Sequence, residues 1–536
     1  MTIARAAKAT ITTAAAAMLL TAAPARATAG DLAAYLRARV ADADGAVAVA
    51  VRDYARALDA APGSVTVALR AYREAVRGGD DALADRAAAT LATLDAAPSD
   101  TALLALASAA RRGDGVAATT AIDRLDRDQL RVLAAPLRGW AALAAGGDAL
   151  APLAAAPRDA VSQRFAAETR ALLLIATGRS AEGVAALRAS SGGDLSAQDE
   201  RVAAARLLIG QGRTQAAAEL IGSGGADTAL HVVPTRGAAP TLAFGVSHLF
   251  TRVAADLASG EPGPLTYTLL RGALRADPGN DRARLLLAGV LASDDALDAG
   301  LAELAGVSAD SGYAQVAATG RVQMLADAGR EEEALAALRR LEAGPDASVA
   351  DLQRLADLNM RLDRPAEAAP LYARLVERAG TRADWADWLQ YGAALDRAGR
   401  WPEARAALEK AVARGRAEPL ALNYLGYALI QRGERMGAAQ KMLERAAALK
   451  PDDAAIADSL GWALLRRGQT ARALPLIERA AQADPVNAEI GEHLGDLYWR
   501  TGRRFEARYA WTAARQTAAA ADRPRLDAKI AGGVAE

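Results

Sequence analysis

Three histidines and one short acidic stretch are the side chains whose types could support metal or acid–base chemistry. His231, His248 and His493 lie far apart in the sequence and form no H-E-x-x-H motif or other close pair of ligands. We therefore expect each of them to be a surface or hinge residue rather than a metal ligand. The stretch Asp42–Gly45 resembles the start of a calcium-binding loop, but Val51 stands at or near the position where such a loop needs a bidentate glutamate. It is better explained as a turn, so no metal site is predicted.

The motifs of nucleophilic and phosphate chemistry are also missing from the sequence. The chain has no cysteine, no G-x-S-x-G elbow and no phosphate-binding G-x-x-x-x-G-K-[ST] loop. None of its five lysines completes an S-x-x-K motif. We therefore predict that the protein is not an enzyme and needs no cofactor. A hydrolase whose site is assembled from scattered carboxylates is the remaining enzymatic alternative.

Composition favours a helical repeat array. The chain has 536 residues, which is more than one hydrophobic core usually holds. Alanine, leucine and arginine dominate, and aromatic residues make up only 4%, which is typical of helices. Lysine plus arginine and aspartate plus glutamate number 64 each, so no sustained basic field indicates a nucleic-acid partner.

The first residues have the features of a secretory signal peptide. Arg5 and Lys8 precede an apolar stretch at 9–23, which Pro24 ends and which is too short to span a bilayer. The following Ala-Arg-Ala predicts cleavage after Ala27, although a first helix or a transit peptide would be the alternative. Without cysteine, a lipid-modified cysteine after the signal is excluded. The mature chain is expected in the periplasm, without a transmembrane segment.

A glycine recurs at nearly constant intervals along the chain. The gaps between the first six are 34, 34, 33, 32 and 34 residues, and those in the later series, where Asp363 replaces one glycine, are 34, 36, 34, 35 and 34. Glycine often ends a helix because it adopts the left-handed conformation at little cost. Gly260 and Asp295 fit between the two series as degenerate members. The turns are Gly45, Gly79, Gly113, Gly146, Gly178, Gly212, Gly329, Gly399, Gly433, Gly468 and Gly502.

Around each turn the residues predict two antiparallel helices. In residues 454–485, Leu460-Gly461 lie on the first helix, Gly468 ends it, two alanines follow on the second helix, and Pro485 comes after it. Small residues let the two helices approach closely, and a proline cannot continue the second helix. The next unit repeats the pattern with Leu494-Gly495.

This order of residues resembles the tetratricopeptide repeat (TPR), in which an LG pair, a large residue, a glycine, two alanines and a proline recur. The resemblance covers residues 31–520 and is specific from Trp385 onward. It implies an all-α protein, a right-handed superhelical solenoid of about fourteen TPR-like hairpins.

One segment departs from the repeat. Gly212 and Gly260 are 48 residues apart, and glycine and proline are dense between them, which marks a loop. We interpret it as a joint, and a longer loop on a continuous solenoid is the alternative. The expected organisation is a signal peptide at 1–27, an N-terminal array at 28–222, the joint at 223–240, a C-terminal array at 241–520 and a tail at 521–536.

In a TPR array the first helices line a concave groove that can bind peptides or partner domains. Counting from the LG pairs, helical spacing assigns aromatic, amide and charged residues to this groove. Trp462 and Trp499 lie off the core pattern, and two alternatives remain for each: a position in the groove or a position in the core. No consecutive repeats supply the Lys, Asn and Arg clamp with which some TPR proteins bind a C-terminal carboxylate. The predicted groove residues are Asn423, Tyr427, Asp458, Trp462, Arg466, Glu492, Asp496, Trp499 and Arg500.

The C-terminal repeats look like those of exported bacterial TPR proteins. Such proteins are often outer-membrane lipoproteins and can act as adaptors for periplasmic enzymes. The resemblance implies a non-catalytic scaffold in the cell envelope that binds a protein or peptide, for example a periplasmic enzyme. The alternative is an accessory protein of polysaccharide export or biosynthesis, because aromatic groove residues also suit sugars.

Overall fold

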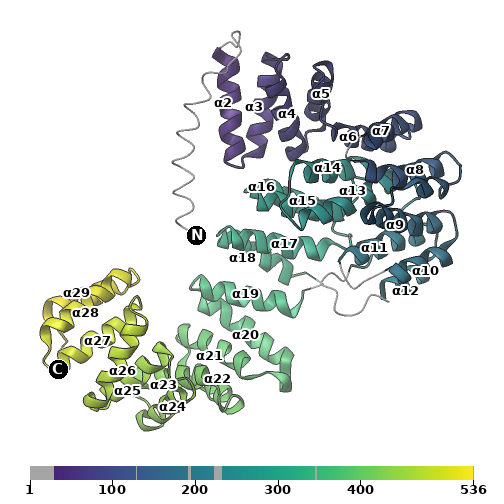
Figure 1. The fold of residues 1–536 in the computed structure, drawn as a ribbon. Coiled ribbons are helices and arrows are strands. Elements are labelled where there is room, and N and C mark those ends of the chain that lie inside the picture. The colour runs from purple at the N-terminus through teal and green to yellow at the C-terminus, as the bar shows by residue number, and fades with distance from the viewer. Residues whose placement is uncertain (1–28, 128–129, 191–194, 223–231, 345–346, 535–536) are drawn as a thin grey trace. The chain divides into compact units, whose positions relative to one another are not determined.

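The structure is a computed structural model that describes residues 29–127, 130–190, 195–222, 232–344 and 347–534 (Figure 1). All regular structure in these residues is helical, and none of them forms a strand. The helices form two compact units, and the chain passes from the first to the second between Arg330 and Glu331. The expected all-helical array of hairpins is confirmed.

Unit 1 ends at Arg330 and holds sixteen described α-helices. Most consecutive helices pack as hairpins, from α2 with α3 to α15 with α16, and α8 packs on a short 3-10 turn instead of a full second helix. The helices are α2 (Ala29–Ala43), α3 (Val47–Ala60), α4 (Val65–Gly78), α5 (Asp81–Thr93), α6 (Thr101–Arg112), α7 (Gly115–Arg127), α8 (Ala134–Ala144), α9 (Ala160–Ala176), α10 (Ser180–Ser190), α11 (Leu195–Gly210), α12 (Thr214–Gly222), α13 (Leu242–Ala258), α14 (Pro264–Ala276), α15 (Asp281–Ser293), α16 (Leu297–Ala305) and α17 (Ala314–Asp327), with 3-10 turns η2 (Arg131–Leu133) and η3 (Ala151–Ala155).

Unit 2 begins at Glu331 and contains five hairpins, from α19 with α20 to α27 with α28, followed by one more helix. Its helices are α18 (Glu331–Glu342), α19 (Val349–Arg361), α20 (Pro365–Ala379), α21 (Trp385–Arg397), α22 (Trp401–Arg414), α23 (Pro419–Arg432), α24 (Met436–Leu449), α25 (Ala454–Arg466), α26 (Thr470–Ala483), α27 (Ala488–Arg500), α28 (Arg504–Thr517) and α29 (Arg523–Gly532), with the 3-10 turn η4 (Gly380–Arg382).

The predicted turn residues adopt the left-handed conformation. All eleven glycines of the two series have a positive φ, as do Asp295 (57°) and Asp363 (55°). At Gly433, for example, φ is 69° and the backbone N–H bonds back to the last turn of α23, which satisfies carbonyl groups that the helix leaves open. The spacing of these residues therefore located the helix ends correctly.

Gly260 is the exception, because its φ is not positive. The preceding helix α13 is long, and its end residue Ser259 keeps a right-handed conformation. The chain then reaches α14 through Gly263 in an extended conformation, with Pro264 in the first turn of the new helix. Proline is favoured there because its fixed φ suits a helix and it needs no N–H donor.

The glycine of each LG pair lies where the first helix touches the second. A Cβ atom at Gly461 would lie 2.4 Å from Cγ1 of Ile477, and one at Gly495 would lie 2.3 Å from Nε1 of Trp511. No real side chain fits at these distances, so only glycine permits this approach. The same arrangement occurs at Gly426, where Leu443 fills the space.

The described chain divides at a different place from the predicted joint. Helices α13 and α14 come after the joint, yet they pack on α4, α6 and α8 of the preceding array (Figure 1). Within the joint, residues 223–231 lie outside the described part, and residues 232–240 contain no helix. The backbone N–H of Ala238 donates to the carbonyl of Arg206 at 2.8 Å, which ties this segment to α11. Unit 1 therefore continues through the joint as one body.

Long-range polar contacts accompany this packing. Arg271 of α14 donates to the carbonyl oxygens of Val76 (3.0 Å) and Arg77 (2.7 Å) at the end of α4. A guanidinium there is favourable, because the carbonyl end of a helix carries partial negative charge. Arg275, which is almost fully buried, bonds to Asp85 at 2.6 Å. These contacts join segments nearly two hundred residues apart in the sequence.

The C-terminal tail expected at 521–536 is a helix in its described part. α29 packs on α28, and Leu526 is buried there with Trp511 and Ala514. Two features of the sequence allow a helix: Pro524 lies in the first turn, and Leu526 and Ile530 lie four residues apart on one face.

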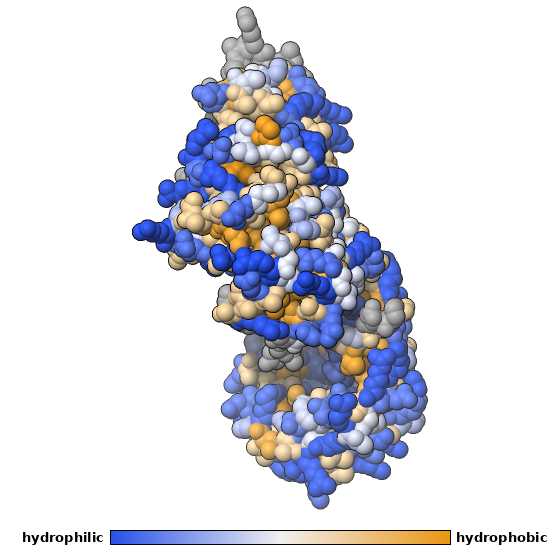
Figure 2. Space-filling view, turned by 90° about the vertical axis from the view of Figure 1, so that its right-hand side faces the viewer, coloured by the Kyte–Doolittle hydropathy of each residue, from blue (hydrophilic) through white to orange (hydrophobic). Residues whose placement is uncertain are grey.

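Most of the face shown in Figure 2 is hydrophilic, with smaller apolar patches between the polar side chains. Over the described residues, every helix is too short or too polar to cross a lipid bilayer.

We expect Gly461→Ala to destabilise the chain by about 1–3 kcal/mol, because the added methyl group overlaps Ile477. Gly437→Ala is a matched control, since a Cβ atom at this helical position meets nothing within 4 Å. That change should be neutral or should stabilise by up to about 1 kcal/mol. Urea unfolding of the full chain, followed by circular dichroism, measures both. Equal effects of the two changes would contradict the close-packing argument.

Candidate functional site

The first helices of unit 2 lie on the inner side of its curve. α21 packs on α23, α23 on α25 and α25 on α27, whereas the second helices of these hairpins contact one another less. The Tyr427 hydroxyl of α23 even reaches Glu489 of α27, past the hairpin between them. We call the shared inner face of α23, α25 and α27 the groove.

Two capped helix starts set the direction of the groove side chains. Asp453 accepts the backbone N–H of Ala455 at 3.1 Å and begins α25, and Asn487 does the same for Glu489 at 3.2 Å and begins α27. Such caps satisfy N–H groups that have no partner within the helix. Residues four apart then share one face, as the pair Asp458 and Trp462 does.

An aromatic and acidic cluster lies at the centre of the groove. The ring of His493 stacks on the ring of Trp462, with centroids 4.0 Å apart and planes at 13°. Nδ1 of His493 lies 2.7 Å from Oδ2 of Asp458, and the Tyr427 ring lies 6.3 Å from the imidazole. Three predicted groove residues therefore meet around a histidine that the sequence analysis had not assigned to the groove.

The surroundings of His493 raise its pKa. Burial alone would lower the pKa, but the negative charge of Asp458 and its hydrogen bond to the ring outweigh burial. Glu489 and Asp496 add to the increase. The folded state therefore favours the protonated imidazole more than water does.

A buried pair of carboxylates follows along α27. Glu492 and Asp496 are each 5% exposed, and Nζ of Lys529 in α29 lies 2.6 Å from the first and 2.7 Å from the second. Arg525 also pairs with Glu492. Trp511 donates from Nε1 to Asp496 at 3.0 Å. Two predicted groove residues are thus held by cations of α29.

Beside these carboxylates lies a cavity of about 530 Å³. Its walls come from α23, α25, α27 and α29, and Trp462, Glu492 and Asp496 are the predicted groove residues among its lining. Trp462 is 8% exposed, and its buried Nε1–H has no hydrogen-bond partner among the described residues. Oδ1 of Asp458 is likewise buried without a donor. A buried polar group without a hydrogen-bond partner costs free energy. A ligand that supplies the missing hydrogen bond would therefore be favoured in the groove.

The other predicted groove residues lie outside the cavity lining. Asn423 is half-buried on α23, while Arg466 and Arg500 are exposed. Trp499 packs differently from the groove expectation: its Nε1 donates to the carbonyl of Val534 at 3.0 Å, and its ring lies 5.5 Å from that of Trp511. The structure thus favours the packing alternative for Trp499, because the segment after α29 covers it.

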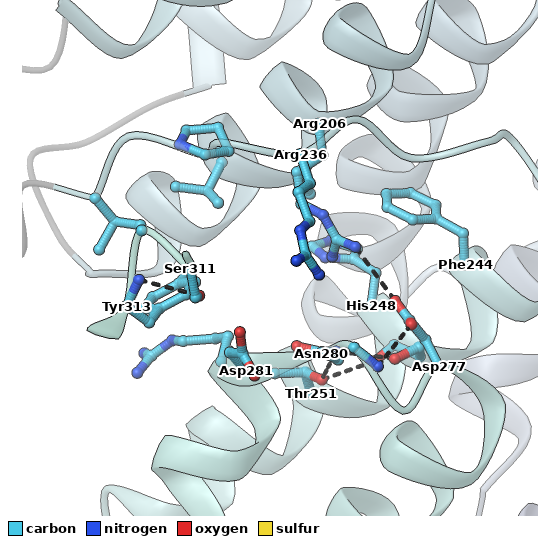
Figure 3. A pocket seen from close by; sticks show the side chains of 18 of the residues that line it. Arg206, Arg236, Phe244, His248, Thr251, Asp277, Asn280, Asp281, Ser311 and Tyr313 are labelled. Atoms are coloured by element: carbon cyan, nitrogen blue, oxygen red, sulfur yellow. Dashed lines mark hydrogen bonds and ion pairs between the residues drawn. The ribbon is translucent and has the colours of Figure 1, made fainter. Parts of the chain in front are cut away.

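Unit 1 has a second cavity, of about 250 Å³, that the sequence did not indicate (Figure 3). Arg206 and Arg236 both line it, and Arg206 reaches Asp277 at 3.3 Å. Asn280 donates to the hydroxyl of Thr251 at 2.9 Å and also to that of Ser247. These residues come from α11, α13, the segment 232–240 and the turn between α14 and α15, so no single spacing in the sequence marks them.

A buried charge cluster adjoins this second cavity. His248 lies 2.8 Å from Glu200, which is 4% exposed. Burial and the charge of Glu200 raise the pKa of Glu168 to about 7, although Arg252 opposes the shift. His248 also has a raised pKa, because Glu200 outweighs the effect of burial. The expectation of surface histidines is therefore wrong for His248 and His493, and His231 lies outside the described residues.

Within the described ranges, no group of three or more histidine, aspartate or glutamate side chains could hold a metal ion. The arrangement of both cavities instead offers hydrogen bonds and charges.

Comparison with protein families identifies the repeat. Residues 321–498 match the family model of the tetratricopeptide repeat, so this part of the chain is a TPR array. The match includes α23, α25 and most of α27, which form the groove. The search among curated proteins found no match.

Several solved structures of repeat proteins are similar to part of the chain. MamA from Desulfovibrio magneticus is 21% identical, with a TM-score of 0.28 over 32% of this chain and 94% of that one. A thermophilic TPR protein from Thermus thermophilus is 20% identical, with a TM-score of 0.30 over 35% of this chain and 98% of that one. The C-terminal part of a TPR protein from Cytophaga hutchinsonii is 17% identical, with a TM-score of 0.29 over 37% and 77%.

The raised pKa of His493 predicts a pH-dependent stability. Its contribution is complete below the unfolded pKa of about 6.5 and is lost as pH rises through the higher folded pKa. The difference in urea midpoint between the wild type and His493→Gln should therefore shrink as pH rises from mildly acidic to alkaline. Because both chains keep Glu168 and His248, the difference isolates His493. A difference that stays constant across this range would rule out the protonated histidine.

Proposed function

We propose that this protein is a non-catalytic scaffold that binds protein or peptide partners in the groove of unit 2. One observation supports this most: Trp462 lines the cavity beside α27, and its buried Nε1–H has no partner among the described residues. A peptide can satisfy this donor, since every residue of its backbone has a carbonyl acceptor.

The TPR match supports a binding role rather than catalysis, because such arrays expose a continuous inner surface between stacked hairpins. Unit 1 is less suited to this role. Its inner helices α4, α6 and α8 are already packed against α13 and α14 of the same chain. The partner surface therefore belongs to unit 2.

The groove fits a protein better than a polysaccharide. Sugars are usually held on open aromatic faces, but Trp462 is almost fully buried and one face of its ring is stacked on His493. Tyr427 is half-buried, and its hydroxyl is bonded to Glu489 and Gln431. Little aromatic surface remains for a sugar ring.

Photo-crosslinking in the cells that make the protein tests the proposal. A photoreactive residue replaces Arg466 or Arg500, which are exposed on the first helices, and in matched controls Arg445 or Arg479, which are exposed on the second helices. We expect discrete protein adducts from the first pair only. Adducts from all four positions alike, or from none, would refute partner binding in the groove.

We further propose that the scaffold works in the periplasm. The basic start and the apolar stretch at 9–23 support export, and these residues lie outside the described part of the structure. Exported TPR proteins that carry lipids are tethered through a cysteine, which this chain lacks.

Export predicts a shortened chain. Mass spectrometry of the protein from a periplasmic fraction should show a mature N-terminus at Thr28. The Ala27→Asp variant should accumulate uncleaved, because signal cleavage needs a small residue there. An intact Met1 in the fractionated wild-type protein would show that the segment is not a signal peptide.

A further inference from the structure

The cavity beside α27 is acidic. Four carboxylates line it, against two cations of α29 and the imidazole of His493. Charge of one sign within a walled cavity concentrates counter-charges and favours partners of the opposite sign. The carboxylates are Glu489, Glu492, Asp496 and Asp522, and the cations are Arg525 and Lys529.

The chain itself shows which group the acidic wall accepts. The ammonium group of Lys529 bridges Glu492 and Asp496 at 2.6 and 2.7 Å, and its side chain is only 17% exposed. Arg525, which like Lys529 lies on α29, pairs with Glu492 of α27. It also pairs with Asp522, just before α29, at 3.1 Å. Three of the four carboxylates are thereby matched by cations of α29.

Glu489 is the carboxylate that is not matched. It is exposed at the start of α27, and it forms no ion pair with any described residue. The hydroxyl of Tyr427 donates to its Oε1, which orients the carboxylate beside the cavity. A charge-assisted hydrogen bond from a partner can therefore form here without displacing α29.

Trp462 supplies a second recognition element. It lines the cavity, and its Nε1–H is buried without a partner, so it can donate to a carbonyl oxygen. Glu489 and Trp462 together fit one basic residue, because Glu489 can bind its charge and the indole N–H of Trp462 can bind its backbone carbonyl.

We propose that the cavity beside Trp462 binds a lysine or arginine side chain of a partner protein, with the cation on Glu489. The inference rests on the proposed function and names the chemistry that the groove selects. α29 forms one wall of the site and neutralises Glu492 and Asp496, so the unpaired charge of Glu489 decides the specificity.

A random heptapeptide library displayed on phage, selected against the full chain, tests this. Selected peptides should be enriched in lysine or arginine at one position, and binding should weaken as salt is added. Glu489→Lys should weaken a selected peptide by about tenfold or more, as expected when a charged hydrogen bond is replaced by repulsion. Glu409→Lys is the control, since Glu409 is also an exposed glutamate but lies on a second helix.

Trp462→Phe separates recognition from folding. Phenylalanine keeps an aromatic ring beside His493 but has no N–H, so peptide binding should fall while the urea midpoint changes little. A midpoint that drops sharply would make this variant uninformative, and Glu489→Lys then carries the test alone.

Three results would overturn the inference in different ways. Peptides that lose affinity with Glu489→Lys but show no basic preference would defeat the specificity and leave the groove as a binding site. If every selected peptide binds Glu489→Lys as well as wild type, the Glu489 site is wrong, while binding elsewhere in the groove stands. If no peptide is selected at all, the proposed function fails too.

Discussion

The close approach of two helices at a glycine is the constraint on which the C-terminal unit depends. At Gly461 and Gly495 the first helix touches the second so closely that the space of a side chain is taken by Ile477 or Trp511. This contact fixes the rotation of the first helix about its axis. The rotation in turn decides which side chains face inward, so Trp462 and Asp496, each one residue beyond such a glycine, owe their positions to it.

Much of the fold follows from local rules and could be read from the sequence. A helix that ends on a left-handed residue needs glycine or a short polar substitute, and the regular spacing of these residues located the turns. Helical spacing also placed Tyr427, Asp458 and Trp462 near one another. Helical spacing cannot show which distant segments of the chain cover a residue. Trp499 is the main example, because the segment after α29 covers it.

The features that could not be predicted depend on long-range contacts. Nothing in the spacing around Pro264 says that α14 packs on α6, because that contact pairs residues far apart in the chain. His493 was expected to be a surface or hinge residue, yet it is 5% exposed because Trp462 and Asp458 supply both a stacking face and a charge. The sequence around a single histidine does not predict its burial, because the side chains that contact His493 lie on the neighbouring repeat.

Both units bury charges, and each places them against a cation or histidine. Buried carboxylates without such partners would be strongly destabilising, so the pairs in α27 and in α13 are needed wherever the repeats bring acidic residues inside. In unit 2 the matching cations are supplied by α29. The last helix therefore balances the charge of α27 as well as covering the apolar end of the array.

The packing of α13 and α14 against earlier helices has a consequence for biogenesis. Until residue 276 has been made, the inner sides of α4, α6 and α8 have nothing to cover them, although these helices are complete long before. A nascent chain at that stage exposes apolar surface and invites aggregation or chaperone binding.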